Sequence, residues 1–127
     1  MTKIVLDTNV FSHKKFCEWL KDSDHNACIS TIGYTELLYH YLKKKGKNTD
    51  FVEVFLDTLN VQVIPYDEEC ARIASEAAIG RWDFRQKARD YMIGSVSVKM
   101  ECPVVTSNKR DFEWVGEVYS PDEFLRG

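Results

Sequence analysis

Short apolar runs alternate with longer segments of helical periodicity along this chain of 127 residues, and this alternation restricts the fold more than any other feature. The apolar runs predict strands at residues 3–6, 27–30, 61–64, 103–106 and 117–119. The segments between them predict helices over residues 10–20, 32–45, 51–59, 68–78 and 86–100. Strands joined by helices run parallel and need cover on both faces. The pattern therefore predicts an α/β chain with three α/β/α layers and a short, mostly parallel central sheet, in a single domain over residues 1–127.

Asp7 ends the first apolar run, Ile4-Val5-Leu6, and is followed by Thr8 and Asn9. Open α/β sheets bind their ligands at the carboxyl ends of the strands, so a carboxylate at this point predicts a ligand site. Asp is also a preferred residue at helix N-caps, and Asp7 is well placed to cap the helix that follows. The two roles are compatible.

Three further acids occur in comparable settings, namely Glu36, Asp90 and Asp111. Each has a simpler interpretation: Glu36 lies away from the apolar stripe of its helix, Asp90 would complement a helix dipole, and Asp111 would be an ordinary turn residue. Taken together, all four acids are expected at one sheet edge, where they predict an oxygen-ligand pocket for Mg²⁺ or Mn²⁺. The small residues Gly94 and Ser97, on the face of Asp90, predict a close approach of that helix to the sheet.

A basic run of Arg81, Arg85, Lys87 and Arg89 comes just before Asp90. Such a run is either a solvated face or a patch that binds phosphate. The net charge of −3 excludes a generally basic nucleic-acid coat but leaves room for a local patch. The position of this run beside an expected metal ligand favours the phosphate-binding interpretation.

No apolar run approaches the roughly 20 residues that a membrane span requires. The sequence starts directly with a strand pattern, so we expect no signal peptide and a cytoplasmic location. The four cysteines form no C-x-x-C pair, which argues against structural zinc.

With these motifs in place, the chain resembles the PIN-domain nucleases, and within them the VapC-type toxins of toxin–antitoxin pairs. The resemblance runs from Val5-Leu6-Asp7-Thr8-Asn9 to Val105-Thr106-Ser107-Asn108-Lys109-Arg110-Asp111-Phe112. Its most specific part is the late segment, Thr-x-Asn-x-x-Asp-Phe after an apolar strand. Gly94-Ser95 departs from the Ala-Ala pair that is commoner in the family, which bears more on the subfamily than on the site.

The resemblance implies a PIN-like fold and an endoribonuclease that cuts single-stranded RNA with one or two Mg²⁺ or Mn²⁺ ions. The implied metal ligands, which are also the implied catalytic residues, are Asp7, Glu36, Asp90 and Asp111. Three further residues are implied to orient these carboxylates, namely Asn9, Thr106 and Asn108.

The resemblance also implies a small antitoxin partner and a homodimer. Aromatic residues expected at the surface would contribute to the dimer contact, and the candidates are Trp82, Phe84, Phe11, Phe16, Tyr39 and Tyr41. Whether the protein is a toxin or has a housekeeping role stays open.

Two alternatives also stay open. One is a non-catalytic PIN-type module that binds RNA or protein. The other is a phosphatase of the haloacid-dehalogenase type, because an apolar strand ending in Asp-Thr-Asn resembles its nucleophile loop. That class requires an acid two residues after the nucleophile, where this chain has Asn9.

Overall fold

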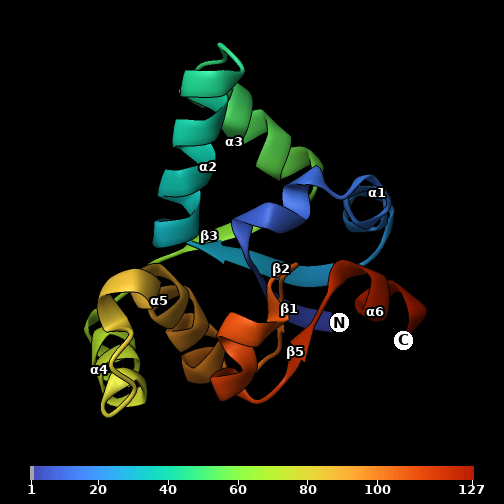
Figure 1. Ribbon diagram of the computed structural model, residues 1–127. Coiled ribbons are helices and arrows are strands. Elements are labelled where there is room, and N and C mark those ends of the chain that lie inside the picture. The colour runs from blue at the N-terminus through green and yellow to red at the C-terminus, as the bar shows by residue number, and fades with distance from the viewer. Residues whose placement is uncertain (1) are drawn as a thin grey trace.

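The computed structural model describes residues 2–127 and shows one five-stranded sheet in which all neighbouring strands run parallel (Figure 1). The strand order is β3-β2-β1-β4-β5. The strands are β1 (Thr2–Leu6), β2 (His25–Ser30), β3 (Gln62–Ile64), β4 (Val104–Val105) and β5 (Val118–Tyr119). The parallel sheet predicted from the alternating pattern is confirmed.

Helices cover both faces of this sheet, as Figure 1 shows. One face carries η1 (Thr8–Ser12), α1 (Lys14–Asp22), α2 (Thr31–Lys44) and α3 (Thr49–Thr58). The other face carries α4 (Glu68–Ala78), α5 (Phe84–Met100) and η2 (Lys109–Val115). The last helix, α6 (Pro121–Arg126), packs against α1 through the ring of Phe124. The three-layer arrangement is therefore confirmed. Over residues 2–127, every helix is too short or too polar to span a bilayer.

Alternation along β1 divides the apolar side chains between two cores. Ile4 and Leu6 point into the core beneath η1, α1, α2 and α3, whereas Val5 points into the core beneath α4, α5 and η2. All three side chains are fully buried. A strand that is apolar on both faces is expected at the centre of a parallel sheet, and β1 occupies that position.

The helix expected over residues 10–20 is wrong in its first part, because two separate elements occupy this region. The 3₁₀ helix η1 ends at Ser12, and His13 then caps α1 by accepting a hydrogen bond at Nδ1 from the Phe16 N–H, at 3.1 Å. A local cap thus overrides the continuous apolar pattern.

Phe16 and Phe11 are buried, so the expectation that they contribute to a dimer surface is wrong.

The helix α5 contains a break near its start. Lys87 has φ −122° and ψ 18°, which are not helical values, although the residues on both sides belong to the helix. The regular part of α5 therefore begins immediately before Asp90, and the two basic residues Lys87 and Arg89 lie at and just after the break.

The strand order creates a switch point between β1 and β4, because the chain continues from β1 to β2 on one side while β4 pairs on the other. Open parallel sheets bind ligands at such a point. Asp7 and Thr106 directly follow these two strands, and the Asp7 N–H donates to the Val105 carbonyl oxygen at 3.0 Å. The fold therefore brings these two polar residues together from opposite ends of the chain.

Candidate active site

Asp7 is fully buried at the switch point, and both of its carboxylate oxygens accept hydrogen bonds. Oδ1 accepts from the Thr8 N–H at 2.8 Å, which also makes Asp7 the N-cap of η1. Oδ2 accepts from the Thr106 hydroxyl at 2.7 Å. Asp7 is thus a helix cap and lies at the sheet edge, while its role in a ligand site stays a prediction.

Glu36 lies in the second turn of α2, a helix that begins at the sheet edge and is capped by Ser30. Its Oε1 accepts from the Thr8 hydroxyl at 2.9 Å. Its position on the helix alone would suggest that Glu36 points into bulk solvent. The hydrogen bond shows that it points toward Asp7 instead. Thr8 connects the two acids, since its amide contacts one and its hydroxyl the other.

Asp90 is almost fully buried in α5, with 8% of the residue exposed. Burial raises the pKa of its carboxyl group above the usual range; the Arg89 guanidinium opposes this, and the nearby charges of Asp111 and Asp7 add to it. The close acids Asp7 and Asp111 thus contribute to the same shift.

Asp111 lies in η2 and is held from two sides. The Lys87 ammonium donates to Oδ1 at 2.5 Å, and the Asn108 amide donates to Oδ2 at 2.5 Å. The hydrogen bond from Lys87 lowers the pKa of Asp111, burial opposes this, and Asn108 adds to the lowering. Asp111 is therefore held in its charged form.

Arg89 lies among the other three acids and binds each of them through a different nitrogen. Nε donates to Glu36, Nη1 donates to Asp90 at 2.6 Å, and Nη2 donates to Asp7. Burial works against the charge of Arg89, but the hydrogen bond to Glu36 and the charge of Asp7 raise the pKa of the guanidinium above its usual range. Three carboxylates from β1, α2 and α5 thus surround one permanent cation.

The donor atoms here suit a hard divalent cation, because all four acids offer carboxylate oxygens. Within residues 2–127, however, no three Asp, Glu, His or Cys side chains are arranged so that they could hold one ion together. The acids are instead held by basic side chains, three by Arg89 and one by Lys87. The chemistry of the donors therefore fits Mg²⁺ or Mn²⁺, while a guanidinium lies between them.

The three residues expected to orient the carboxylates differ in what they contact. Thr106 donates to Asp7 and accepts from the Asn108 N–H at 3.0 Å, and the Asn108 side chain donates to Asp111. Asn9 contacts no carboxylate; its Oδ1 accepts from the Ser107 N–H at 3.1 Å. Asn9 thus holds the loop after β4 against η1, and Thr106 and Asn108 contact the acids.

The sequence pattern did not reveal how Lys87, Arg89 and Thr8 take part in the site. Lys87 and Arg89 were grouped in a run expected to face solvent or phosphate, but both bind the acids. The sequence does show that Arg89 directly precedes Asp90. A run of basic residues does not indicate, however, in which direction each side chain points. Thr8 carries no charge and follows Asp7 directly, so the sequence does not indicate that its hydroxyl contacts Glu36.

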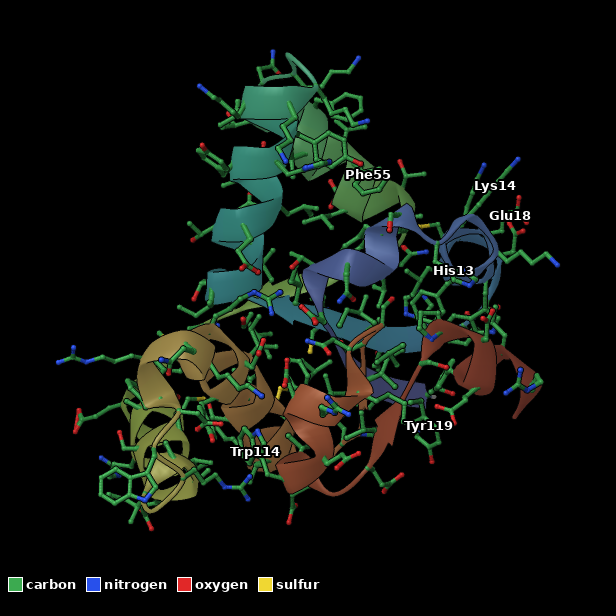
Figure 2. The ribbon with its side chains drawn as sticks, in the orientation of Figure 1. His13, Lys14, Glu18, Phe55, Trp114 and Tyr119 are labelled. Carbon is green, nitrogen blue, oxygen red and sulfur yellow. The ribbon has the colours of Figure 1, made fainter. Side chains whose placement is uncertain are left out.

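Gly94 makes the contact that joins α5 to η2. A Cβ atom at Gly94 would lie 2.5 Å from Cζ2 of Trp114 and 2.9 Å from Cγ2 of Val115. The close approach predicted for this helix is therefore real, but its partner is η2 and not the sheet. Figure 2 shows Trp114 between η2 and the α4–α5 pair, and its ring lies 5.5 Å from that of Tyr91. This contact fixes the elements that carry Asp90 and Asp111 relative to each other.

An open cleft of about 590 Å³ adjoins the acids on the η1–α2 side. It starts at Thr8 and Glu36 and extends along α2 to His40, Tyr41 and Lys45. Aromatic rings and a lysine beside clustered acids suit a nucleic-acid strand, since bases stack on rings and phosphates pair with cations.

Comparison with known proteins gives a consistent family and fold. Residues 4–118 match the family model described as the PIN domain. DNA-bound VapBC from Salmonella typhimurium is similar to the chain with a TM-score of 0.68 at 26% identity, over 95% of this chain and 99% of that one. VapBC-1 from nontypeable Haemophilus influenzae gives a TM-score of 0.69 at 17% identity, over 95% and 99%. FitAcB from Neisseria gonorrhoeae gives a TM-score of 0.68 at 23% identity, over 93% of this chain and 97% of that one. No match was found among curated proteins.

Proposed function

The chain belongs to the PIN-domain family, and on this basis we propose that it is a divalent-cation-dependent endoribonuclease that cuts single-stranded RNA. The observation that carries the proposal is the meeting of Asp7, Glu36 and Asp90 around a single cationic group at the switch point of the sheet. Asp111 is tied to the same part of α5, because it accepts a hydrogen bond from Lys87, two residues before Arg89. Four acids from four segments of the chain cluster in this way only at considerable electrostatic cost, which a divalent cation would remove.

Asp7, Glu36, Asp90 and Asp111 are the residues that would hold Mg²⁺ or Mn²⁺. When bound, such an ion polarises a phosphate oxygen and makes water a stronger nucleophile near neutral pH, which is the chemistry that phosphodiester hydrolysis needs. Around that position, the Thr106 hydroxyl holds Asp7 in one orientation. The Asn108 amide likewise holds Asp111.

The cleft along α2 is the part of the surface best suited to receive the RNA strand. Tyr41 and His40 offer rings for base stacking, and Lys45 offers a cation for the backbone. Stacking on side chains requires bases that are free of a duplex, so this cleft supports a single-stranded substrate.

We further infer that a small antitoxin protein restrains the nuclease and that the protein is a toxin acting on cytoplasmic RNA. The similar VapBC structures support this inference at the level of fold. A homodimer also belongs to the proposal: Tyr39, Trp82 and Phe84 are exposed, at 62%, 95% and 44%, and a self-complementary contact would cover such residues.

The direct test is cleavage of a fluorescently labelled single-stranded RNA by the purified protein, followed on denaturing gels. We expect cleavage with Mg²⁺ or Mn²⁺, none with EDTA, and none by Asp7→Asn under any condition. Asp57→Asn is the matched control, because Asp57 is an exposed acid of α3 outside the site. Cleavage that persists in EDTA, or that Asp7→Asn retains in full, would contradict the metal mechanism.

The pairing of Arg89 with Asp7, Glu36 and Asp90 favours a second candidate, the non-catalytic PIN-type module. If Arg89 never leaves the acids, the domain binds RNA or protein without cutting. This alternative predicts RNA binding in gel-shift experiments with no cleavage at any cation concentration. The phosphatase alternative is not carried forward, because the PIN-domain match covers residues 4–118.

A further inference from the structure

The position of Arg89 among the acids has a meaning beyond fold stability. Its planar guanidinium presents donors in several directions, and here they are distributed over Glu36, Asp90 and Asp7. A surface arginine that served only to support α5 would need one carboxylate partner. Contact with three acids from three elements instead places the guanidinium at the centre of the site.

A guanidinium and a divalent cation cannot occupy the same position among these carboxylates at the same time, because both need that space and both are positively charged. Oδ1 of Asp7, Oε2 of Glu36 and Oδ1 of Asp90 already accept from Arg89. We propose that Arg89 occupies the place of the cation in the metal-free protein, and that Mg²⁺ or Mn²⁺ binds only after this side chain has withdrawn. This inference rests on the proposed function, because it assigns the four acids to a metal.

Withdrawal of Arg89 is compatible with the fold. The side chain is 36% exposed, so part of it already contacts solvent in this position. Its backbone stays in α5, which is fixed to η2 through Gly94 and Trp114. When Arg89 leaves, Asp7 keeps its hydrogen bonds from Thr8 and Thr106, and Glu36 keeps its hydrogen bond from Thr8.

Lys87 provides the internal comparison. It carries the same charge and lies two residues away, but among residues 2–127 it binds only Asp111. Substitution of either residue removes one positive charge beside the acids, whereas only substitution of Arg89 vacates the centre of the site. The difference between the two variants therefore separates competition for the site from general electrostatics.

The experiment is calorimetric titration of MnCl₂ into chelator-treated protein at fixed ionic strength. The variants are Arg89→Gln, Lys87→Gln and the distant control Arg72→Gln, which removes an exposed pair with Glu68 on α4. If the open form is a minor state of about 10% or less, Arg89→Gln should bind Mn²⁺ about tenfold or more tighter than the wild type. Lys87→Gln should show a smaller gain and Arg72→Gln none.

A second measurement on the wild-type protein does not depend on a variant that folds. The Nε–Hε NMR resonance of Arg89, assigned in the wild-type protein by through-bond correlation to its own backbone, should move toward the position of free arginine as Mg²⁺ is added. Three outcomes would overturn the inference alone. The first is equal Mn²⁺ affinity in wild type and Arg89→Gln, and the second is an equal gain in affinity in Arg89→Gln and Lys87→Gln. The third is an Arg89 resonance that does not move at saturating Mg²⁺. Absence of cation binding in all variants would overturn the proposed metal mechanism together with it.

Discussion

Arg89 and Asp90 are neighbours in sequence, yet the Arg89 side chain contacts both the Asp90 carboxylate, at 2.6 Å, and Asp7, which lies 82 residues earlier. One side chain thus joins α5 to the end of β1. Because Arg–carboxylate contacts of this kind are directional, they define the relative position of the two elements. The relationship also means that the acid and the group that neutralises it are carried by the same turn of helix.

Expression of the chain alone should slow bacterial growth, because an unrestrained ribonuclease degrades RNA. Asp7→Asn should be harmless at an equal soluble level, since it removes a buried negative charge while the side chain keeps nearly the same size. Co-expression of the proposed small antitoxin should restore growth with the wild type. Equal growth of wild type and Asp7→Asn would contradict the toxin assignment and leave the nuclease assignment to assays with purified protein.

Thr106→Val should weaken both the site and the fold. The hydroxyl donates to Asp7 and accepts from the Asn108 N–H, and Thr106 is fully buried. Loss of these two partners should cost about 1–3 kcal/mol in the free energy of unfolding. Loss of a group that orients a metal ligand should reduce Mn²⁺ affinity about 10–100-fold. Urea unfolding and calorimetry measure the two effects. Thr106→Ser keeps the hydroxyl and should keep the Mn²⁺ affinity, while the loss of its buried methyl group should cost about 1 kcal/mol.

Gly94→Ala should destabilise the protein by about 1–3 kcal/mol, which is the usual cost of overpacking. The added methyl group would meet Trp114 at 2.5 Å, and this outweighs the better helix propensity of alanine. Urea unfolding measures the loss, and tryptophan fluorescence should report a displaced Trp114. In a Trp114→Leu background the same substitution should cost clearly less, because the clash with Trp114 is absent and only the contact with Cγ2 of Val115, at 2.9 Å, remains. An equal loss in both backgrounds would mean that the contact is not the cause.

Glu123 should stabilise the protein in a pH-dependent way. The hydrogen bond from Lys109, with that from the Ser120 N–H, lowers the pKa of Glu123 from 4.5 to about 2. The folded carboxyl group is thus a weaker base than the unfolded one, so its contribution is complete above pH 4.5 and disappears as the pH falls toward 2. The melting temperature of Glu123→Gln should lie below that of the wild type near pH 7 and should equal it near pH 2. A difference that stays constant over this range would rule out the ionic contribution.

Much of the fold could be predicted because its determinants are local. The two-sided burial of β1 and the cap of α6 at Ser120, which forms a full capping box with Glu123, follow from short stretches of sequence. The break between η1 and α1 could not, because it depends on the His13 side chain binding the Phe16 N–H in place of continued helix. The order of the strands also lies beyond local patterns, since it depends on which crossover each helix takes.

The candidate site shows the same division. Strand ends place Asp7 and Thr106 at the sheet edge, and this could be read from their positions after apolar runs. The direction of the Arg89 side chain could not, because it depends on the break at Lys87 and on acids that lie far away in sequence. Gly94 lies between these cases: its small size predicted a close approach, while the identity of Trp114 as the neighbour required the fold.

The break in α5 at Lys87 has a consequence for the speed of the protein as well as for its equilibrium. Arg89 lies two residues beyond the break, where the backbone has left and then resumed helical geometry. If the Arg89 side chain must withdraw before a cation enters, the rate of cation uptake will rise with concentration only up to the rate of withdrawal and then level off. A site that was already open would show a rate that keeps rising. Stopped-flow mixing would thus reveal a delay, set by one side chain beside the break, between the arrival of the ion and its binding.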